Sequence, residues 1–215
     1  MGYGTYMSTF SQLGTSEERL WKLVGDRCET GANVEKIDQK IWDLFGEKWS
    51  ILFTDLSGFS RGVQNFGIIH FLQIIHEHNC IVAPIIDAHQ GFLLKAEGDS
   101  LMVLFRRPAS ALACSIAMQQ ACQRVSQRRT AEEAILLCVG LGYGDVLRVG
   151  EHEVFGAEVN AASKLGEDTA EAHEILVTDA FIKECGDLGT MTYEPLDVVI
   201  PGTHKAYRVN YMSEE

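Results

Sequence analysis

The sequence predicts an α+β fold of ferredoxin-like type, with the element order β-α-β-β-α-β, additional strands and a helix after it, and a helical extension before it. Two observations carry this prediction: a buried strand that leads into a helical span and a tight hairpin, and a second helix that is followed by another buried strand. A chain of 215 residues, 46% of them hydrophobic, is long enough for one such domain and a short extension. We expect the extension at 1–46 and the main domain at 47–215.

Two helices are expected in the extension. Thr15 and Glu18 have the spacing of a capping box, which starts a helix that runs to about Cys28. A second helix follows, because apolar residues recur at helical spacing at Val34, Ile37, Ile41, Leu44 and Phe45. This stripe fits either a helix packed on its own core or a helix that contacts a second copy of the chain.

The first strand of the main domain runs from Trp49 to Thr54 and ends on a carboxylate, Asp55. Ser57 and Gly58 then break the strand, and their small size lets backbone N–H groups approach a ligand closely. A carboxylate beside such a turn suits a metal ion that also binds phosphate. The alternative is that Asp55 only caps the following helix.

A second carboxylate, Asp99, lies in a predicted β-hairpin over 91–105. An aspartate at a hairpin tip is usually a turn residue. The combined pattern is less common, however: a strand with Asp-x-x-Gly-Phe, a helical span, and then Lys-x-x-Gly-Asp in a hairpin.

The remaining elements follow from periodicity and turn residues. The span 60–88 is predicted to be helical, with its buried side at Phe66, Ile69, Leu72, Ile75 and Ile81. Further elements are a helix from Pro108 to about Arg128, strands at 134–141 and 145–150, a helix at 156–167, a strand at 175–177, a short helix at 178–185 and a last strand at 207–212. The glycines of Gly140-Leu141-Gly142-Tyr143-Gly144 do not form a dinucleotide-binding loop, because the third Gly is at the wrong offset and no helix follows directly.

Charge and cysteine usage limit the partners and the compartment. The net charge of −12 disfavours nucleic acid and anionic membrane surfaces as partners. The six cysteines include no C-x-x-C pair, which favours a reducing cytoplasm. Neither a signal peptide nor a bilayer-spanning run is recognisable, so we expect a free-standing protein without membrane insertion.

Three blocks of the sequence, in order and at matching spacing, resemble a known family. Phe-Thr-Asp-Leu-Ser-Gly-Phe-Ser (53–60), Lys-Ala-Glu-Gly-Asp-Ser (95–100) and Phe-Gly-Ala-Glu-Val-Asn-Ala-Ala-Ser-Lys-Leu (155–165) are similar to the signature blocks of class III nucleotidyl cyclase catalytic domains. The resemblance covers roughly 47–211 and implies the cyclase version of the ferredoxin-like core.

The resemblance implies a binding site for two divalent metal ions, Mg²⁺ or Mn²⁺. Asp55 and Asp99 match the family's metal-binding aspartates, and the backbone carbonyl of Leu56 matches an additional ligand. Carboxylate oxygens together with substrate phosphates are ordinary Mg²⁺ ligands. The turn amides expected to bind phosphate oxygens belong to Ser57, Gly58, Phe59 and Ser60.

The resemblance also implies how the purine base is read. Lys95 and Glu153 match the two base-reading positions. A lysine can donate to adenine N1, and a carboxylate can accept from the exocyclic amine, so Lys95 favours ATP. Glu153 is one methylene longer than the aspartate that adenylyl cyclases usually carry there.

Residues that act on the ribose and phosphates follow from the third block. Asn160 matches the asparagine that orients the ribose, and Lys164 stands where the family has an arginine that stabilises the charged phosphoryl group. A lysine lacks the bidentate fork of arginine. Either Lys164 serves in this role or Arg148 supplies the cation, and Lys205 is the candidate for binding the triphosphate. Glu97 departs from the apolar residue usual in the family; it would act as a further metal ligand or pair with Lys95.

In the family, the metal-binding aspartates come from one subunit and the base-reading and transition-state residues from the other. This chain carries both sets, so the resemblance implies a head-to-tail homodimer with two equivalent interfacial sites. The leading hypothesis is an adenylyl cyclase. The alternatives are a cyclase-fold nucleotide-binding or regulatory module of low activity, and a cyclase that uses GTP or a pyrimidine nucleotide.

Overall fold

The computed structural model describes residues 14–58, 67–186 and 191–211. The chain forms two compact units, which are described separately. The first contains residues 1–47 and 146–155, and the second contains residues 48–145 and 156–215. Within the described ranges no helix combines the length and the apolar character needed to cross a membrane.

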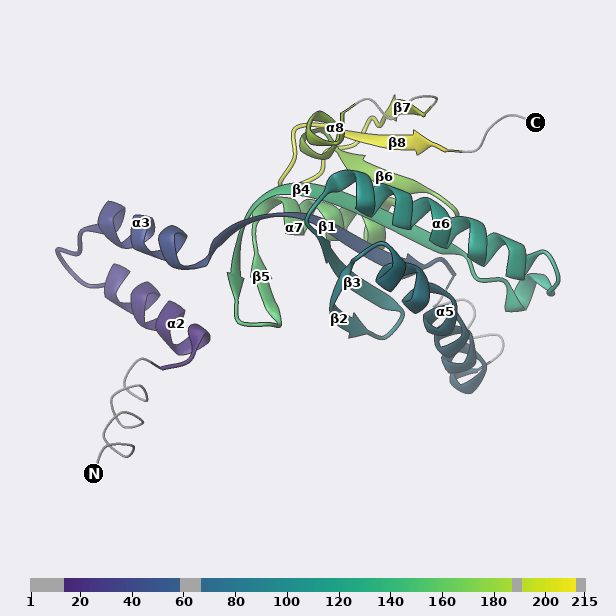
Figure 1. The fold of residues 1–215 in the computed structure, drawn as a ribbon, viewed down its shortest axis with the longest axis horizontal. Helices are drawn as coiled ribbons and strands as arrows, with labels where there is room; N and C mark the ends of the chain where they lie inside the picture. The colour runs from purple at the N-terminus through teal and green to yellow at the C-terminus, as the bar shows by residue number, and fades with distance from the viewer. Residues whose placement is uncertain (1–13, 59–66, 187–190, 212–215) are drawn as a thin grey trace. The chain divides into compact units, whose positions relative to one another are not determined.

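A mixed sheet is the centre of the fold (Figure 1). Neighbouring strands follow the order β2 (Phe92–Glu97), β3 (Ser100–Phe105), β1 (Gly46–Leu56), β4 (Leu137–Val149), β6 (Ile175–Thr178), β8 (Ala206–Asn210), β7 (Thr192–Pro195), and β5 (Glu153–Phe155) pairs with β4. β4 and β6 run parallel, whereas β3 is antiparallel to β1 and to β2. The predicted α+β fold with a ferredoxin-like core and additional C-terminal strands is confirmed.

In the first unit, α2 (Ser16–Arg27) and α3 (Val34–Phe45) enclose a small core. The predicted capping box is present: the backbone N–H of Glu18 donates to Thr15 Oγ1 over 3.2 Å, and the backbone N–H of Thr15 donates to Glu18 Oε2 over 2.7 Å. Four buried side chains of the helices pack with one from the end of β4; these are Leu20, Leu23, Ile41, Phe45 and Val149. In the predicted α3 stripe, Ile37, Ile41 and Phe45 thus face an intrachain core, whereas Val34 and Leu44 are exposed.

In the second unit, helices cover both faces of the sheet. One face carries α5 (Ile68–Ala88), α6 (Pro108–Ser126) and α8 (Asp179–Cys185), whose core includes Leu137, Val139 and Leu141 of β4. Residues alternate between the faces of a strand, so the glycines between these positions lie on the other face. That face carries α7 (Ala157–Ser163), with Ala161 and Leu165 in a core of its own.

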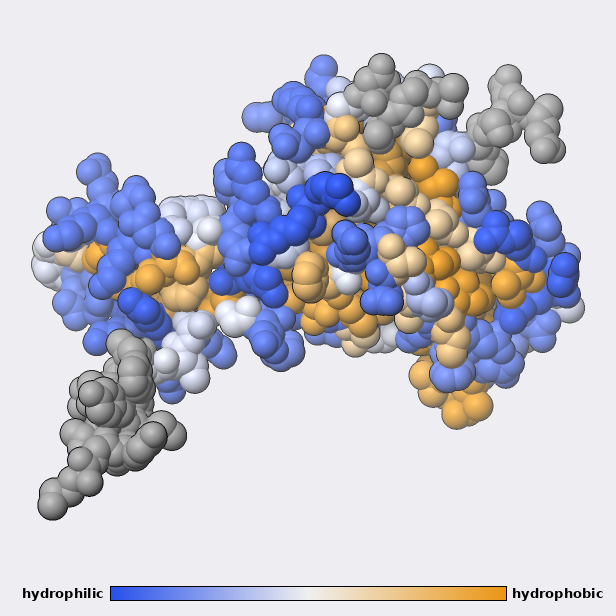
Figure 2. All heavy atoms as spheres, in the orientation of Figure 1, coloured by the Kyte–Doolittle hydropathy of each residue, from blue (hydrophilic) through white to orange (hydrophobic). Residues whose placement is uncertain are grey.

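The buried side predicted for the helix at 60–88 is wrong for Ile69 and Leu72, whereas Ile75 and Ile81 are partly buried against the core. The residues buried along α5 are Phe71, Ile74, His78, Val82 and Ile86. Ile69 is 75% exposed and Leu72 is 51% exposed, and apolar atoms are visible at the end of α5 in Figure 2. The helix carries apolar residues on more than one side, so periodicity alone could not select the buried one. Phe66 lies outside the described residues.

Strand boundaries in the second half of the chain also differ from the prediction. The two strands expected at 134–141 and 145–150 form one strand, β4, which continues through Gly140, Gly142 and Gly144. The short strands β5 and β7 were not predicted, because three or four residues show too little alternation. The predicted helix at 156–167 divides into α7 and a π-helix at Lys164–Thr169.

A histidine lies among the apolar residues that α5 buries. His78 is fully buried, and neither ring nitrogen makes a hydrogen bond of good geometry with a described residue. Burial lowers the pKa of His78 to about 4, and the neighbouring Asn79 offsets only part of this effect. The folded chain therefore holds His78 neutral, while the unfolded chain binds a proton near its ordinary pKa of 6.5.

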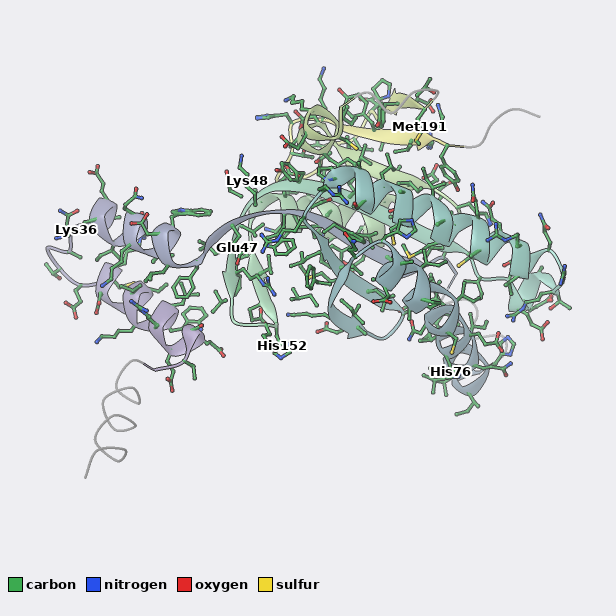
Figure 3. The ribbon with its side chains drawn as sticks, in the orientation of Figure 1. Lys36, Glu47, Lys48, His76, His152 and Met191 are labelled. Carbon is green, nitrogen blue, oxygen red and sulfur yellow. The ribbon has the colours of Figure 1, made fainter. Side chains whose placement is uncertain are left out.

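We expect His78→Leu to stabilise the protein, because it removes unsatisfied polar atoms from a buried position; the gain at pH 7 is about 1–2 kcal/mol. The folded-state pKa lies below the unfolded value, so wild-type stability falls as the pH drops from about 6.5 towards 4, and the advantage of the variant grows in that window. Chemical denaturation at several pH values measures both effects. His76→Leu is the control, because His76 lies on the exposed side of the same helix (Figure 3). Equal stabilities of wild type and His78→Leu at pH 5 would contradict the prediction.

Candidate active site

Two aspartates from adjacent strands meet at one end of the sheet. Asp55 is the penultimate residue of β1, and Asp99 lies in the two-residue turn between β2 and β3. The pairing of β1 with β3 aligns Thr54 with Leu101, which places the hairpin turn beside the end of β1. Ser100, next to Asp99, has its hydroxyl Oγ 3.4 Å from Asp55 Oδ1. Asp55 and Asp99 are both half-buried.

The two carboxyl groups interact electrostatically. Burial and the charge of Asp99 raise the pKa of Asp55 to about 6. Burial also raises the pKa of Asp99, although hydrogen bonds from nearby backbone amides and from Asp55 oppose this effect. A half-buried pair of like charges is unfavourable unless a proton or a cation lies between them. The arrangement therefore favours cation binding.

The donor set fits a hard divalent cation that completes its coordination with phosphate. Among the residues that the structure describes, no three His, Cys, Asp or Glu side chains gather closely enough to hold a metal ion. Mg²⁺ commonly takes only one or two carboxylates and fills its other positions with water and substrate phosphates. Asp55 and Asp99 are such a pair.

The turn after Asp55 provides fewer free amides than the sequence suggested. The backbone N–H of Ser57 donates to the Leu136 carbonyl over 2.8 Å, so it is engaged within the protein. Gly58 has a φ of +91°, which favours glycine, and a Cβ there would meet no atom within 4 Å. Phe59 and Ser60 lie outside the described residues.

The candidate base-reading lysine lies in the hairpin that carries Asp99. Lys95 is half-buried on β2 opposite Met102 of β3, just after a register shift at Leu93. Glu97 is exposed and faces Ser100 at the end of the hairpin. Lys95 and Asp99 thus belong to one two-stranded element.

Asn160 and Lys164 follow one another on the outer side of α7 and its continuation. Both are exposed, and they are four residues apart, about one helical turn. The ammonium of Lys164 pairs with Asp168 Oδ2 over 2.5 Å, and this ion pair raises the pKa of Lys164. The pair lies in the π-helix, a wide turn that is often found at functional sites. Because both partners are more than half exposed, solvent screens the pair and a phosphate can compete with it.

The loop that carries Lys205 lies against α7. Gly202 has a φ of +99°, and a Cβ there would approach the carbonyl oxygen of Ala157 to 2.3 Å. The Lys205 carbonyl accepts from the Asp179 N–H over 3.0 Å, and the Lys205 side chain is exposed. The structure therefore brings the loop of Lys205 next to the helix of Asn160.

The two remaining candidates, Arg148 and Glu153, belong to the first unit. They lie on the β4–β5 hairpin, whose turn includes His152 (Figure 3). Arg148 pairs with Val154, and its side chain lines a polar hollow of about 550 Å³ together with Arg19 and Glu47. Glu153 is half-buried opposite Val149.

Two acidic residues near these elements were missed from the sequence. The charge of Glu167 raises the pKa of both Asp55 and Asp99, and a Cβ on the preceding Gly166 would approach the Phe53 carbonyl oxygen to 2.9 Å. Glu158, in the first turn of α7, is half-buried and hydrogen-bonded to β4. Neither has a recognisable sequence signal, because each is an isolated or surface-like acidic position in a predicted helix.

Comparisons with known proteins agree with this geometry. The model of the family described as "Adenylate and Guanylate cyclase catalytic domain" matches residues 46–208. The chain belongs to this family. Both aspartates, both base-reading candidates, Asn160, Lys164 and Lys205 lie within the matched range.

The curated relatives of this cyclase domain are much longer than this chain. The chain is 28% identical over 130 residues to "Putative adenylate cyclase 3" of Rhizobium meliloti (strain 1021), a match that covers 60% of this chain and 22% of the relative. The chain thus spans about a fifth of the length of the curated relatives it matches.

Solved cyclase structures share the fold. The guanylyl cyclase Cya2 matches with a TM-score of 0.64 at 21% identity, over 79% of this chain and 94% of that one. The adenylyl cyclase CyaB from P. aeruginosa matches with a TM-score of 0.64 at 22% identity, over 78% of this chain and 96% of that one. At these identities the likeness establishes the fold and not the base.

Proposed function

We propose that this cyclase domain converts ATP to 3′,5′-cyclic AMP and pyrophosphate at the interface of a head-to-tail homodimer in the cytoplasm. The observation that carries the proposal is the half-buried pair Asp55 and Asp99, whose mutual repulsion and burial favour a bound cation. Two divalent ions, Mg²⁺ or Mn²⁺, would lower the pKa of the ribose 3′-hydroxyl and neutralise the leaving pyrophosphate. Asp55, Asp99 and the Leu56 carbonyl are the residues that would hold them.

The side chains of the protein have separate roles in this proposal. Lys95 donates to adenine N1, and Glu153 accepts from the exocyclic amine. Asn160 orients the ribose so that the 3′-hydroxyl is in line with the α-phosphate. Lys164 stabilises charge on the phosphoryl oxygens, with Arg148 as the alternative cation.

The phosphates have their own candidate contacts. Lys205, on the loop held against α7, binds the triphosphate, and the turn from Ser57 to Ser60 contacts phosphate oxygens through Gly58 and the residues after it. The exposure of the Lys205 side chain leaves it accessible to a nucleotide.

Incubation of the purified chain with each of the four nucleoside triphosphates and Mg²⁺ or Mn²⁺ tests this function. Cyclic AMP, identified by mass spectrometry and formed faster than the other cyclic nucleotides, is the expected product. The protein concentration is varied across the monomer–dimer transition followed by sedimentation, and specific activity should rise with the dimer fraction. No cyclic nucleotide from the dimer would overturn the proposal, and cyclic GMP as the main product would overturn its assignment of the base.

A second candidate is a nucleotide-binding module with little turnover. The ion pair of Lys164 with Asp168 favours it, because the cation expected at the phosphoryl group is directed to a neighbouring carboxylate. This candidate predicts nucleotide binding by calorimetry without product formation.

We expect Lys164→Arg to raise kcat about tenfold, because a guanidinium can contact phosphoryl oxygens with two N–H groups where an ammonium acts as a point charge. Lys164→Ala should lower kcat by about 10²-fold or more, the usual effect of losing one well-placed donor. Steady-state kinetics with ATP measures both variants. Lys183→Arg is the matched control, since Lys183 forms an equivalent pair with Asp179 at four-residue spacing on α8. A kcat unchanged by Lys164→Ala would assign the cation role to another residue.

A further inference from the structure

α7 lies directly on a segment of β4 that presents glycines, and so no side chains, towards the helix. Gly140, Gly142 and Gly144 alternate along β4 on the face that α7 covers. A Cβ at Gly140 would come within 2.2 Å of the Ala162 carbonyl oxygen, and one at Gly142 within 2.7 Å of the Glu158 carbonyl oxygen. Such contacts are far shorter than any real Cβ makes, so the helix backbone rests on the strand backbone.

This close approach leaves few contacts that fix the helix along the strand. Helices are normally positioned by side chains that interlock with those of the neighbouring element. On the glycine track of β4 no side chain interlocks with α7, which has only seven residues. Its position along the strand therefore depends on contacts elsewhere: the core around Ala161 and the contacts at the beginning of the helix.

Glu158 forms such a contact at the beginning of α7. Its Oε2 accepts from the backbone N–H of Tyr143 over 3.1 Å and from the hydroxyl Oγ1 of Thr178 over 2.7 Å. Tyr143 belongs to β4, and Thr178 is the last residue of β6 and the N-cap of α8. One carboxylate oxygen therefore ties the helix to two neighbouring strands.

The Tyr143 amide lies just beyond the end of the β4–β6 pairing. Along β4, the N–H of Val139 donates to the Glu174 carbonyl of the adjacent segment, and the parallel pairing with β6 extends to Leu141 and Val177. In this register the next carbonyl belongs to Thr178, which is the N-cap of α8, and the pairing of β4 with β6 ends before it. The Tyr143 N–H donates to the Glu158 carboxylate at this end of the ladder.

We propose that Glu158 is a positioning residue for the cyclase reaction: by bonding to Tyr143 and Thr178 it fixes where α7 lies on the glycine track, and with it where Asn160 and Lys164 meet the nucleotide. Asn160 follows Glu158 by two residues and lies on the exposed side of the helix, whereas the Glu158 side chain points to the strands. Glu158 contacts neither ribose nor phosphate in this scheme. The proposal rests on the proposed function, since it assigns Glu158 a part in that reaction.

Three substitutions of Glu158 distinguish the effect of losing its two hydrogen bonds from the effect of losing its charge. The amide oxygen of Glu158→Gln can accept both bonds with its two lone pairs, so kcat is expected to stay within threefold of wild type. Glu158→Ala removes both bonds and Glu158→Asp retracts the acceptor by one methylene. We expect kcat to fall about 10- to 100-fold in these two variants, with a KM for ATP within about threefold, because a misplaced helix impairs the reacting geometry.

Ile86→Val on α5 is the control for loss of stability alone, because Ile86 is buried on the opposite face of the sheet. All kinetics are measured at a temperature where each variant is fully folded by circular dichroism, and Ile86→Val should keep the wild-type kcat. A folded Glu158→Ala with wild-type kcat overturns the proposal, and so does a Glu158→Gln that loses as much as alanine. If Glu158→Ala does not fold, the kcat of Glu158→Asp is used instead, and a wild-type value overturns the proposal.

Amide hydrogen exchange tests whether Glu158 holds α7 without relying on the proposed catalytic activity. The Tyr143 amide and those of α7 should exchange at least tenfold faster in Glu158→Ala than in wild type and remain protected in Glu158→Gln, while the Val139 amide remains protected in both variants. If wild type makes no cyclic nucleotide, the proposed function fails. Protection of the Tyr143 amide that is unchanged in Glu158→Ala shows that Glu158 does not hold the helix.

Discussion

Replacing Asp55 with asparagine is expected to reduce cyclic nucleotide formation by at least 10³-fold and to stabilise the metal-free protein. An asparagine side chain binds divalent cations far more weakly than a carboxylate, so the site loses one of its two acidic ligands. In the metal-free chain the same change removes a half-buried charge that burial and Asp99 destabilise. After allowance for solvent access to the site, the gain is about 1 kcal/mol at pH 7.5.

The pKa of Asp55 determines how the stability difference between wild type and Asp55→Asn changes with pH. The folded-state pKa of Asp55 is about 6, above the ordinary value of 3.8, so the wild-type fold loses stability as Asp55 ionises with rising pH. The Tm advantage of Asp55→Asn should be greatest above pH 6 and should shrink as the pH falls towards 4. Added Mg²⁺ or Mn²⁺ should raise the Tm of wild type more than that of the variant.

Differential scanning fluorimetry across pH, with and without metal, measures these effects, and Asp87→Asn on the exposed surface of α5 is the control. A lower Tm for Asp55→Asn than for wild type at pH 7.5 without metal would contradict the electrostatic argument. Undiminished turnover would contradict the metal-binding role.

Replacing Gly140 with alanine is expected to destabilise the second unit by about 3 kcal/mol or more, at the upper end of what overpacking usually costs. The added methyl would lie 2.2 Å from the Ala162 carbonyl oxygen and 2.3 Å from the Gly166 nitrogen. Both are backbone atoms, so no rotamer change relieves the contact and α7 must move away from β4. Turnover should fall even where the variant is folded, because Asn160 and Lys164 move with the helix.

Alanine substitutions at two other glycines provide a comparison for the loss of stability expected in Gly140→Ala. Gly144→Ala should cost less than Gly140→Ala, because its nearest contact is the flexible side chain of Glu158, at 2.9 Å from Cγ. Gly25→Ala in α2 meets nothing within 4 Å and should stabilise by about 0.5–1 kcal/mol. Urea unfolding of the three variants tests the order. A Gly140→Ala variant as stable as wild type would show that the helix does not rest on this strand.

Structural features that depend on a few adjacent residues were predictable from the sequence, and those that depend on packing were not. Thr15 with Glu18, Pro108 and the hairpin turn at Gly98 and Asp99 were predictable, because caps and turns are specified by a few adjacent residues. The buried side of α5 was not, since Ile69 and Ile74 are equally apolar and only the packing of the helix on the sheet separates them.

Some residues of the candidate site were likewise predictable from the sequence, and others required the structure. Asp55 and Asp99 could be paired from the sequence because the blocks that carry them resemble those of the cyclase family, in which the matching aspartates bind metal; their positions at a strand end and in a hairpin turn only agreed with this. The engagement of the Ser57 amide by Leu136, the pairing of Lys164 with Asp168 and the part of Glu158 depend on contacts between segments that the sequence does not bring together. The glycines at 140–144 were correctly excluded as a dinucleotide loop, but their role as a surface for α7 required the structure.

The glycine track also limits how this cyclase can diversify. A side chain added at Gly140 or Gly142 would meet backbone atoms of α7, so such substitutions lose the fold before selection can test their effect on chemistry. Changes of rate or substrate preference are therefore expected at positions away from this track, such as 160 and 164, and in the surrounding loops. A library that randomises only those outward positions would retain far more folded members than one that randomises the whole helix.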